Sequence, residues 1–321
     1  MSDRSATAEL WARLVRPFNP AGALEALTGM PPSTAHHLVG IAIATSPEVD
    51  ALLDRMHDTL RSLAIATAST PTRSVGEIRG PVLWSETIAA RAASPGAHDV
   101  YICVSPVKAY DTDENRVLVN ALTRVRDAAR AADPTMQHDD AEDVLRRARH
   151  NGTRAIRALE HRTLSSVSRA RATGRSMQKA RSGSKARSYR TAVAVLERCA
   201  EPITADHVGL YCDEQSVRQH RLLLDLLDRM ASRGHSDASQ LRVHDGTLRA
   251  GPLRYLHRHR SESDGLYGVL LGDLLLDAVN PTAGHDVVQA EIELVQRANG
   301  HPALVIGNPN DLERAFRLAG L

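Results

Sequence analysis

The sequence predicts a mostly helical α+β protein with a small central β element, an Asp-Gly hairpin and a C-terminal strand-helix unit. Apolar residues recur at helical spacing, most clearly at residues 48–65. Asp245 and Gly246 lie between two short β-type segments, and this pair favours the two-residue turn of a β-hairpin. The apolar run at residues 303–306 predicts a buried strand, and residues 312–318 the helix that follows it.

Length and composition set limits on the core and on the number of domains. A chain of 321 residues is long enough for two domains, or for one domain with an extension. Hydrophobic residues make up 42% of the chain and aromatic residues only 3%, so aliphatic side chains must fill the core. We expect a helical N-terminal region at 1–70, a central region at 71–200 and an α+β C-terminal domain at 201–321.

The central region is expected to open with a connector and two strands. Residues 66–74 are rich in Thr, Ser and Pro, which is typical of a connecting segment. Residues 75–78 and 100–104 have the β-branched composition of short strands, and residues 111–132 have the pattern of a helix.

Residues 146–190 form the most unusual segment. They contain 14 Arg and Lys residues and a single acid, Glu160, so their formal charge is +13. Because the whole chain carries +2, the remainder carries −11. We expect the first part of the segment to be helical, with one face packed, and residues 171–188 to be a mobile loop rich in Ser and Gly.

Two interpretations of this basic segment stay open. It is either an arm that contacts nucleic acid, or a solvated connector whose charge is balanced by the acidic remainder. Nearly all of its cations are arginines, which suit bidentate contacts with phosphate. The candidate nucleic-acid contacts are Arg154, Arg157, Arg162, Arg169, Arg171, Arg175, Lys179, Arg181, Lys185 and Arg187.

The sequence shows no nuclease centre of the PD-(D/E)XK type. Such a centre needs an Asp and a Glu at one metal, with a Lys just after the Glu in the pattern Glu-x-Lys. The chain contains no lysine after Lys185, and none of the candidate acids Asp273, Asp277, Glu291 and Glu293 has the required neighbour. We interpret these acids as solvent-facing and structural, and we assign no catalytic residue.

A metal site is not expected either. Cys199, His207, Cys212 and His220 are separated by seven, four and seven residues, without the close cysteine pair of structural zinc sites. The sequence favours two buried cysteines and two histidines on helix surfaces. We expect no metal and no other cofactor, and the sequence identifies no small-molecule substrate.

Cysteine usage and hydropathy indicate the compartment. Three cysteines are too few for a disulfide framework, and the first 14 residues lack the basic and apolar regions of a secretory leader. The longest apolar patches fall short of the roughly 20 residues that a membrane span needs. We therefore expect a cytoplasmic protein without a membrane segment.

Two motifs resemble those of McrC-like restriction proteins. The first is Gly80-Pro-Val-Leu-Trp84-Ser-Glu-Thr87, with Arg91 behind it. The second is Tyr110-Asp111-Thr112-Asp113-Glu114-Asn115-Arg116, which resembles the Asp-Thr-x-Glu-Asn-Arg helix start of that family. The order and separation of the two motifs agree with the family, and Ser188-Tyr189-Arg190 is a weaker third match.

The resemblance implies a role in DNA restriction. In that family the matched region precedes a PD-(D/E)XK nuclease, and McrC works with a ring-forming AAA+ GTPase on modified DNA. Because the nuclease residues have no counterpart here, we expect a non-catalytic accessory protein of a prokaryotic restriction or phage-defence system, which binds DNA, an AAA+ NTPase or both. The alternatives are a stand-alone nucleic-acid-binding protein that uses the basic arm, and a divergent metal-dependent nuclease.

The matched residues also have a purely structural interpretation, which we favour. Asp111 and Glu114 are expected to cap the helix at 111–132 in a variant of the capping box. Asn115 and Arg116 would tie that helix to its surroundings, and Arg116 is expected to have a partner inside the chain, because the helix dipole does not favour a cation at its start. Trp84 is expected to be a large buried contact.

Overall fold

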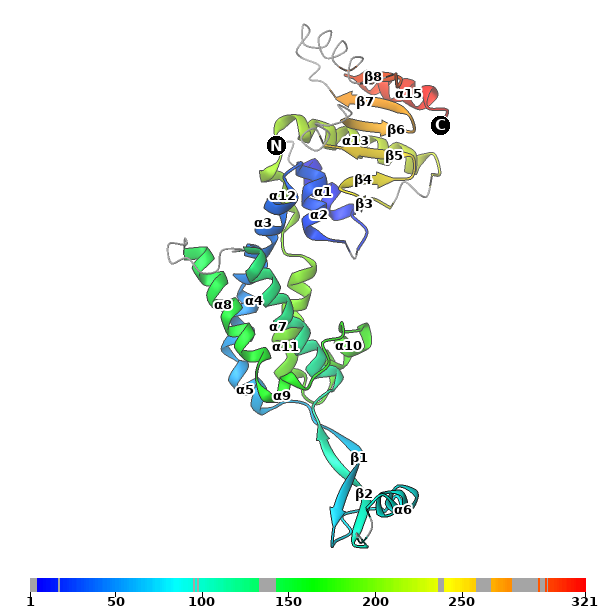
Figure 1. The fold of residues 1–321 in the computed structure, drawn as a ribbon. Helices are drawn as coiled ribbons and strands as arrows, with labels where there is room; N and C mark the ends of the chain where they lie inside the picture. Colours follow the sequence, from blue (N-terminus) through cyan, green and yellow to red (C-terminus); the bar gives the residue numbers. More distant parts are fainter. Residues whose placement is uncertain are drawn as a thin grey trace. The chain divides into compact units, whose positions relative to one another are not determined.

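The chain folds as a mostly helical α+β protein with two sheets. The computed structural model describes residues 5–16, 18–94, 96, 98–132, 143–235, 240–257, 267–278, 294, 298 and 300–321. Two compact units are present (Figure 1). Unit 1 comprises Met1–Ser46, Ala128–Arg149 and Glu197–Leu321, and unit 2 comprises Pro47–Asp127 and His150–Leu196. The expected boundary between residues 70 and 71 falls inside a strand, so the units divide the chain differently from the three expected regions.

Unit 1 contains a six-stranded sheet with the order β3-β4-β5-β6-β7-β8. Neighbouring strands are antiparallel from β3 to β7, and β8 is parallel to β7. The strands are β3 (Arg242–His244), β4 (Thr247–Ala250), β5 (Leu253–Leu256), β6 (Gly268–Leu271), β7 (Leu274–Ala278) and β8 (Ala303–Ile306).

The expected Asp-Gly hairpin is confirmed between β3 and β4. Asp245 and Gly246 both have positive φ, at 48° and 64°, as the tight turn of a twisted hairpin requires. The C-terminal strand-helix unit is confirmed as β8 followed by α15 (Pro309–Leu318). Asn308 caps α15, because its side chain accepts hydrogen bonds from the backbone N–H groups of Asn310 and Asp311.

Helices complete unit 1 and share one apolar core with the sheet. Leu226 and Met230 of α13 are buried in a cluster that includes Tyr255 of β5 and Phe316 of α15. Most members of the cluster are Leu, Ala and Val, so the expected aliphatic core is confirmed. The other helices of this unit are α1 (Ser5–Arg13), α2 (Pro20–Thr28), α3 (Pro32–Ala44), α12 (Ala205–Val208) and the 3-10 turn η1 (Gly209–Tyr211), with α13 at Glu214–Ser232.

Unit 2 combines helices with a long two-stranded hairpin. Helices α7, α8 and α11 contribute residues to both units. The helices are α4 (Pro47–Asp54), α5 (Met56–Arg61), α6 (Trp84–Ala92), α7 (Asp113–Ala132), α8 (Asp143–Leu159), α9 (Arg162–Ser165), α10 (Gly174–Ser182) and α11 (Ala186–Ala200).

The connector expected at residues 66–74 is wrong, because these residues form a strand. β1 (Ala66–Val75) pairs with β2 (Val100–Ala109) in antiparallel register, from Ala66 opposite Ala109 to Val75 opposite Val100. Threonine has a high strand propensity, and a proline such as Pro71 is tolerated because both strands of a two-stranded ribbon are edge strands.

The mobile loop expected at residues 171–188 is also wrong. Residues 174–182 form α10, and its start is fixed by a capping box. The Thr173 side chain accepts from the Ser176 N–H, and the Ser176 side chain accepts from the Thr173 N–H. Such reciprocal capping satisfies two amides that a helix start leaves free, so a short, highly charged helix is stable here.

Membrane-spanning character is absent from the described helices. None of them is both long and apolar enough to cross a bilayer.

A buried histidine lies in the core of unit 1. His220 on α13 is fully buried, and its Nδ1 lies 2.8 Å from the Thr7 hydroxyl oxygen. Its ring meets the ring of Tyr255 edge to face. Burial, followed by the neighbouring His257, lowers the pKa of His220 to about 3. The histidine is therefore held neutral inside the fold, and the expectation that it lies on a helix surface is wrong.

The stability of the chain should fall in mild acid because of His220. The unfolded chain gains a proton at His220 below pH about 6.5, whereas the folded chain does so only near pH 3. His220 should therefore lower the free energy of unfolding as the pH falls through this window, by roughly 2 kcal/mol between pH 7 and pH 5. Urea unfolding at a series of pH values measures this. The His220→Gln variant should lose that part of the pH dependence, whereas His36→Gln, at an exposed histidine of the same unit, should keep it. An unchanged slope in His220→Gln would contradict the assignment.

Candidate functional site

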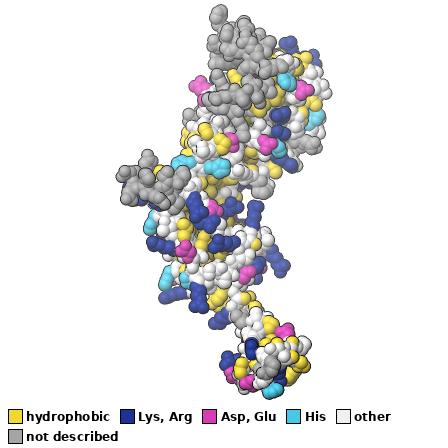
Figure 2. All heavy atoms as spheres, viewed as in Figure 1, with side chains coloured by type: hydrophobic (Ala, Val, Ile, Leu, Met, Phe, Trp, Pro, Cys, Tyr) yellow, Lys and Arg dark blue, Asp and Glu magenta, His cyan; other side chains and the backbone are white. Residues whose placement is uncertain are grey.

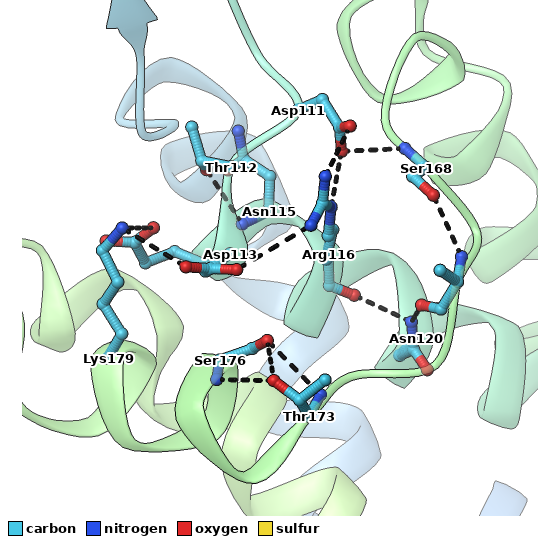
Figure 3. A network of polar contacts seen from close by, with 12 residues as sticks. Asp111, Thr112, Asp113, Asn115, Arg116, Asn120, Ser168, Thr173, Ser176 and Lys179 are labelled. Atoms are coloured by element: carbon cyan, nitrogen blue, oxygen red, sulfur yellow. Dashed lines mark hydrogen bonds and ion pairs between the residues drawn. The ribbon is translucent and has the colours of Figure 1, made fainter.

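The start of α7 carries the second motif and lies in a network of polar contacts (Figure 3). The Asn115 side chain is fully buried. Its Nδ2 donates to the carbonyl oxygens of Ala64, at 2.9 Å, and Tyr110, at 2.7 Å. Ala64 comes shortly before β1 and Tyr110 directly after β2. One amide therefore holds together the two chain segments at the root of the hairpin.

Tyr189 of α11 completes this junction. Its hydroxyl donates to Asn115 Oδ1 and accepts from the Ala64 N–H, at 2.7 Å. Burial raises the pKa of Tyr189 to about 12. The phenol therefore stays protonated and keeps its donor. The Ser-Tyr-Arg match noticed in the sequence thus includes a residue that contacts the second motif directly.

Arg116 has a partner inside the chain, as expected. Its Nε and Nη2 each donate to one carboxylate oxygen of Asp111 at 2.8 Å. The guanidinium hydrogen bond lowers the pKa of Asp111 below its usual range. Asp111 Oδ1 also accepts from the Ser168 N–H at 3.1 Å. The Asp111 carboxylate therefore fastens a distant loop to the start of α7.

The capping box expected for Asp111 and Glu114 is wrong. The Thr112 hydroxyl accepts from the Asn115 N–H at 3.3 Å and so occupies the capping position. Asp111 is drawn away by Arg116, and Glu114 instead forms an ion pair with Lys179 of α10, at 3.6 Å. Arginine offers Asp111 two parallel, charge-assisted hydrogen bonds, which a single backbone amide does not match.

Three of the candidate cations have partners inside unit 2. Lys179 is paired with Asp113 as well as Glu114. The Lys185 ammonium donates to the carbonyl oxygens of Ser62 and Leu63. Arg154 of α8 is paired with an aspartate of α4 at 2.8 Å. These side chains fix the helices of unit 2 and are less free to contact a ligand.

The remaining cations are exposed on unit 2. One of them, Arg181, takes part in an interaction and is therefore set apart from the others. Among the described residues, no carboxylate lies within ion-pair distance of the other exposed arginines between Arg157 and Arg190. We call them the free arginines: Arg157, Arg162, Arg169, Arg171, Arg175, Arg187 and Arg190.

The two units differ in formal net charge. Unit 2 contains 20 Lys and Arg residues and 12 Asp and Glu residues, which gives +8, and the rest of the +2 chain therefore carries −6. In Figure 2, Lys and Arg side chains gather over the helices of unit 2. A surface of this kind attracts polyanions.

The first motif belongs to the module of the hairpin and α6. Gly80 has a φ of 149°, and a Cβ there would lie 2.4 Å from the Val104 carbonyl oxygen. Glycine is therefore required where residues 81–83 run alongside β2. The Thr87 side chain is fully buried and accepts from the Ile102 N–H at 2.9 Å. These two residues of the motif hold the chain against β2.

The expectation that Trp84 is buried is wrong. Its side chain is 60% exposed at the first residue of α6. Ile88, one helical turn further on, is 63% exposed. In α6 only Thr87 is buried. A single helix that packs on a two-stranded ribbon has no further element to cover the face that points away from the ribbon.

The acids and cysteines that lie in the described part of the chain do not come together as a metal site. Within the described part of the chain, no three potential metal ligands form a cluster. Asp277 is buried on β7 and accepts from the side chains of Gln215 and Gln219, so it is structural but does not face solvent. Glu291 and Glu293 lie outside the described residues.

Asn120 of α7 is a site residue that the sequence analysis missed. Its side chain contacts the chain between α9 and α10 through two hydrogen bonds. Asparagine is a poor helix former, and it lies one turn after Arg116 in an otherwise regular helix. That local mismatch is the signal in the sequence that could have identified it.

Comparisons with known proteins add no relative. A search against protein-family models finds no match to this chain, and a search of curated proteins finds none either. The resemblance to McrC-like proteins therefore depends on the motif residues alone.

Asn115→Ala and Trp84→Ala should have opposite effects on stability. The first removes three hydrogen bonds and leaves the Ala64 carbonyl unsatisfied in the interior, so it should lower the free energy of unfolding by roughly 2 to 4 kcal/mol. The second removes an exposed side chain and should change it by no more than about 0.5 kcal/mol. Urea unfolding of the two variants beside the unchanged protein measures both. A large loss in Trp84→Ala, or none in Asn115→Ala, would contradict the structure of the two motifs.

Proposed function

We propose that this chain is a non-catalytic, McrC-like accessory protein of a prokaryotic DNA-restriction or phage-defence system, and that it binds DNA through the free arginines of unit 2. The observation that carries the proposal is the set of seven exposed arginines without a described carboxylate partner. A connector whose charge is balanced by direct ion pairs would have carboxylates beside these side chains, and none of the described carboxylates lies there.

The chemistry of the surface favours contacts with phosphates over contacts with bases. Arginine presents a planar fork of donors that matches the oxygens of a phosphate. Single-stranded nucleic acid is usually held by exposed aromatic side chains on which bases stack. Between residues 150 and 196 the sequence contains one aromatic residue, Tyr189, and it is buried. We therefore propose a duplex ligand that is bound through its backbone.

DNA binding should depend steeply on salt. If six or more arginines contact phosphates, the affinity for a duplex of arbitrary sequence should fall by roughly a thousandfold or more between 50 and 200 mM salt. Changing Arg157, Arg162, Arg175 and Arg187 to Gln should reduce the slope of log affinity against log salt by about 4. Fluorescence anisotropy titrations at several salt concentrations measure this slope.

The matched control carries the same change of charge elsewhere. Replacing Arg242, Arg254, Arg314 and Arg317 of unit 1 by Gln also removes four positive charges and should leave the slope nearly unchanged. An equal loss in both variants would show that net charge alone governs binding. Affinity that ignores salt would overturn the proposal, and cleavage of the duplex in Mg²⁺ would favour a divergent nuclease instead.

An AAA+ NTPase is a second candidate partner, which the exposed side chains of α6 favour. Trp84 and Ile88 lie one helical turn apart, so they share a face, and both are mostly exposed. Large exposed apolar side chains in such an arrangement are typical of contacts between proteins. We propose that this face contacts the NTPase that the resemblance implies.

If an AAA+ NTPase is encoded next to this chain, the two proteins should co-elute in size-exclusion chromatography. Changing Trp84 and Ile88 to Ser should weaken the complex by about tenfold or more, because buried aromatic anchors dominate such interfaces. The control is Ile65→Ser, at another exposed apolar residue of unit 2. A complex that both variants leave intact would exclude this face, and the absence of any complex would exclude the NTPase.

A further inference from the structure

The segment between α9 and α10 is held on α7 by contacts between side chains and backbone. Asp111 accepts from the Ser168 N–H at 3.1 Å. Asn120 Nδ2 donates to the Ala170 carbonyl at 2.7 Å, and Asn120 Oδ1 accepts from the Ala172 N–H at 3.1 Å. Figure 3 shows the contact between Asp111 and Ser168, and Asn120 on α7. The backbone of every second residue from 168 to 172 is therefore fixed to α7 or to Asp111, which lies just before it.

The Asn120 side chain is itself fixed in one orientation. Its Nδ2 donates a second hydrogen bond to the Arg116 carbonyl, at 3.0 Å. Both N–H groups and the oxygen of the amide are then used, and a flipped amide would place an oxygen against two carbonyls. Asp111 is held in the same way by the two hydrogen bonds from Arg116.

Two free arginines lie between the fixed residues. Arg169 follows Ser168, and Arg171 lies between Ala170 and Ala172. Both are exposed, and no described carboxylate lies within ion-pair distance of either. Residues 168–172 belong to no helix or strand, so the side chains of Asp111 and Asn120 substitute for the regular hydrogen bonds that would otherwise order this backbone.

We infer that Asp111 and Asn120 are positioning residues, which hold Arg169 and Arg171 in place for contact with DNA phosphates. The inference deepens the proposed function and rests on it. Binding by side chains on a disordered loop costs conformational entropy at the moment of binding, and a loop that is already ordered avoids that cost. Asp111 and the neighbouring Arg116 come from the second motif, so its residues would act on the ligand without touching it.

Asn120→Ala tests the inference. It removes both hydrogen bonds to residues 168–172 and should weaken binding to a short duplex by about tenfold, since the loop must then be ordered on binding. Arg169→Gln with Arg171→Gln should weaken binding at least as much, because two phosphate contacts are lost. If Asn120 acts only through these arginines, adding Asn120→Ala to the arginine pair should cause no further loss. Thr123→Ala, at a neighbouring position of α7, should bind as the unchanged protein does.

Any other result overturns the inference, and the pattern of losses shows whether the proposed function fails with it. If the arginine pair weakens binding and Asn120→Ala does not, the positioning role is excluded and the proposed function stands. The same holds if the losses add, because Asn120 would then act elsewhere. If the arginine pair has no effect while the change of Arg157, Arg162, Arg175 and Arg187 does, residues 168–172 lie outside the interface. If neither set of arginines matters, the proposed function fails as well.

Hydrogen exchange provides a test that needs no variant. In the free protein the Ala172 N–H should exchange slowly, because it is bonded to Asn120. Exchange at the rate of an open chain would show that the segment is not held before DNA binds, and it would overturn the inference even if Asn120→Ala does not fold.

Discussion

The buried carboxamide of Asn115 holds unit 2 together at the root of its hairpin. It bonds the segment before β1, the segment after β2 and the phenol of Tyr189. The Tyr110 carbonyl and the Tyr189 hydroxyl each have a second hydrogen bond, from the Thr112 N–H and the Ala64 N–H. The Ala64 carbonyl would be left without a partner in the interior, and such a group costs about 1–3 kcal/mol. A carboxamide can donate two hydrogen bonds through its nitrogen and accept through its oxygen, so the single Asn115 side chain bonds to groups from three chain segments. The start of α7 is fixed in this way, and the neighbouring residues can then bind the basic segment.

The ion pairs of unit 2 separate its cations into two kinds. Lys179 and Arg154 are paired with carboxylates, and the Lys185 ammonium is bonded to backbone carbonyls. These contacts order the helices that carry the free arginines. The ordering matters because a rigid cationic surface loses less entropy on meeting a polyanion than a flexible tail does. The basic segment is therefore better described as a folded surface, since α8, α10 and α11 account for most of it.

The two motifs differ in what they contribute. Gly80 and Thr87 of the first serve the packing of residues 80–92 against β2, whereas Trp84 is left exposed. The second motif is almost wholly engaged within unit 2, through Asn115 and the pair of Arg116 with Asp111. The second motif thus has the structural role that was expected, whereas the exposure of Trp84 is the opposite of what the scarcity of aromatic residues suggests. The size of a side chain predicts how much area it can bury, but only its neighbours decide whether it is buried.

Local patterns in the sequence determined the α+β class, the Asp-Gly turn and the C-terminal strand and helix, because each depends on dihedral preferences or apolar spacing within a few residues. The charge of the basic segment was equally plain from the sequence. The tertiary structure decided which arginines remain free and that residues 66–74 pair with β2. It also decided that Asp111 binds Arg116 instead of capping α7 and that Asn120 holds residues 168–172. Most of these features depend on residues that are far apart in the sequence, such as Asn120 and Ala170. The pair of Asp111 with Arg116 depends on competition between two possible partners, and no local sequence pattern shows which partner is within reach.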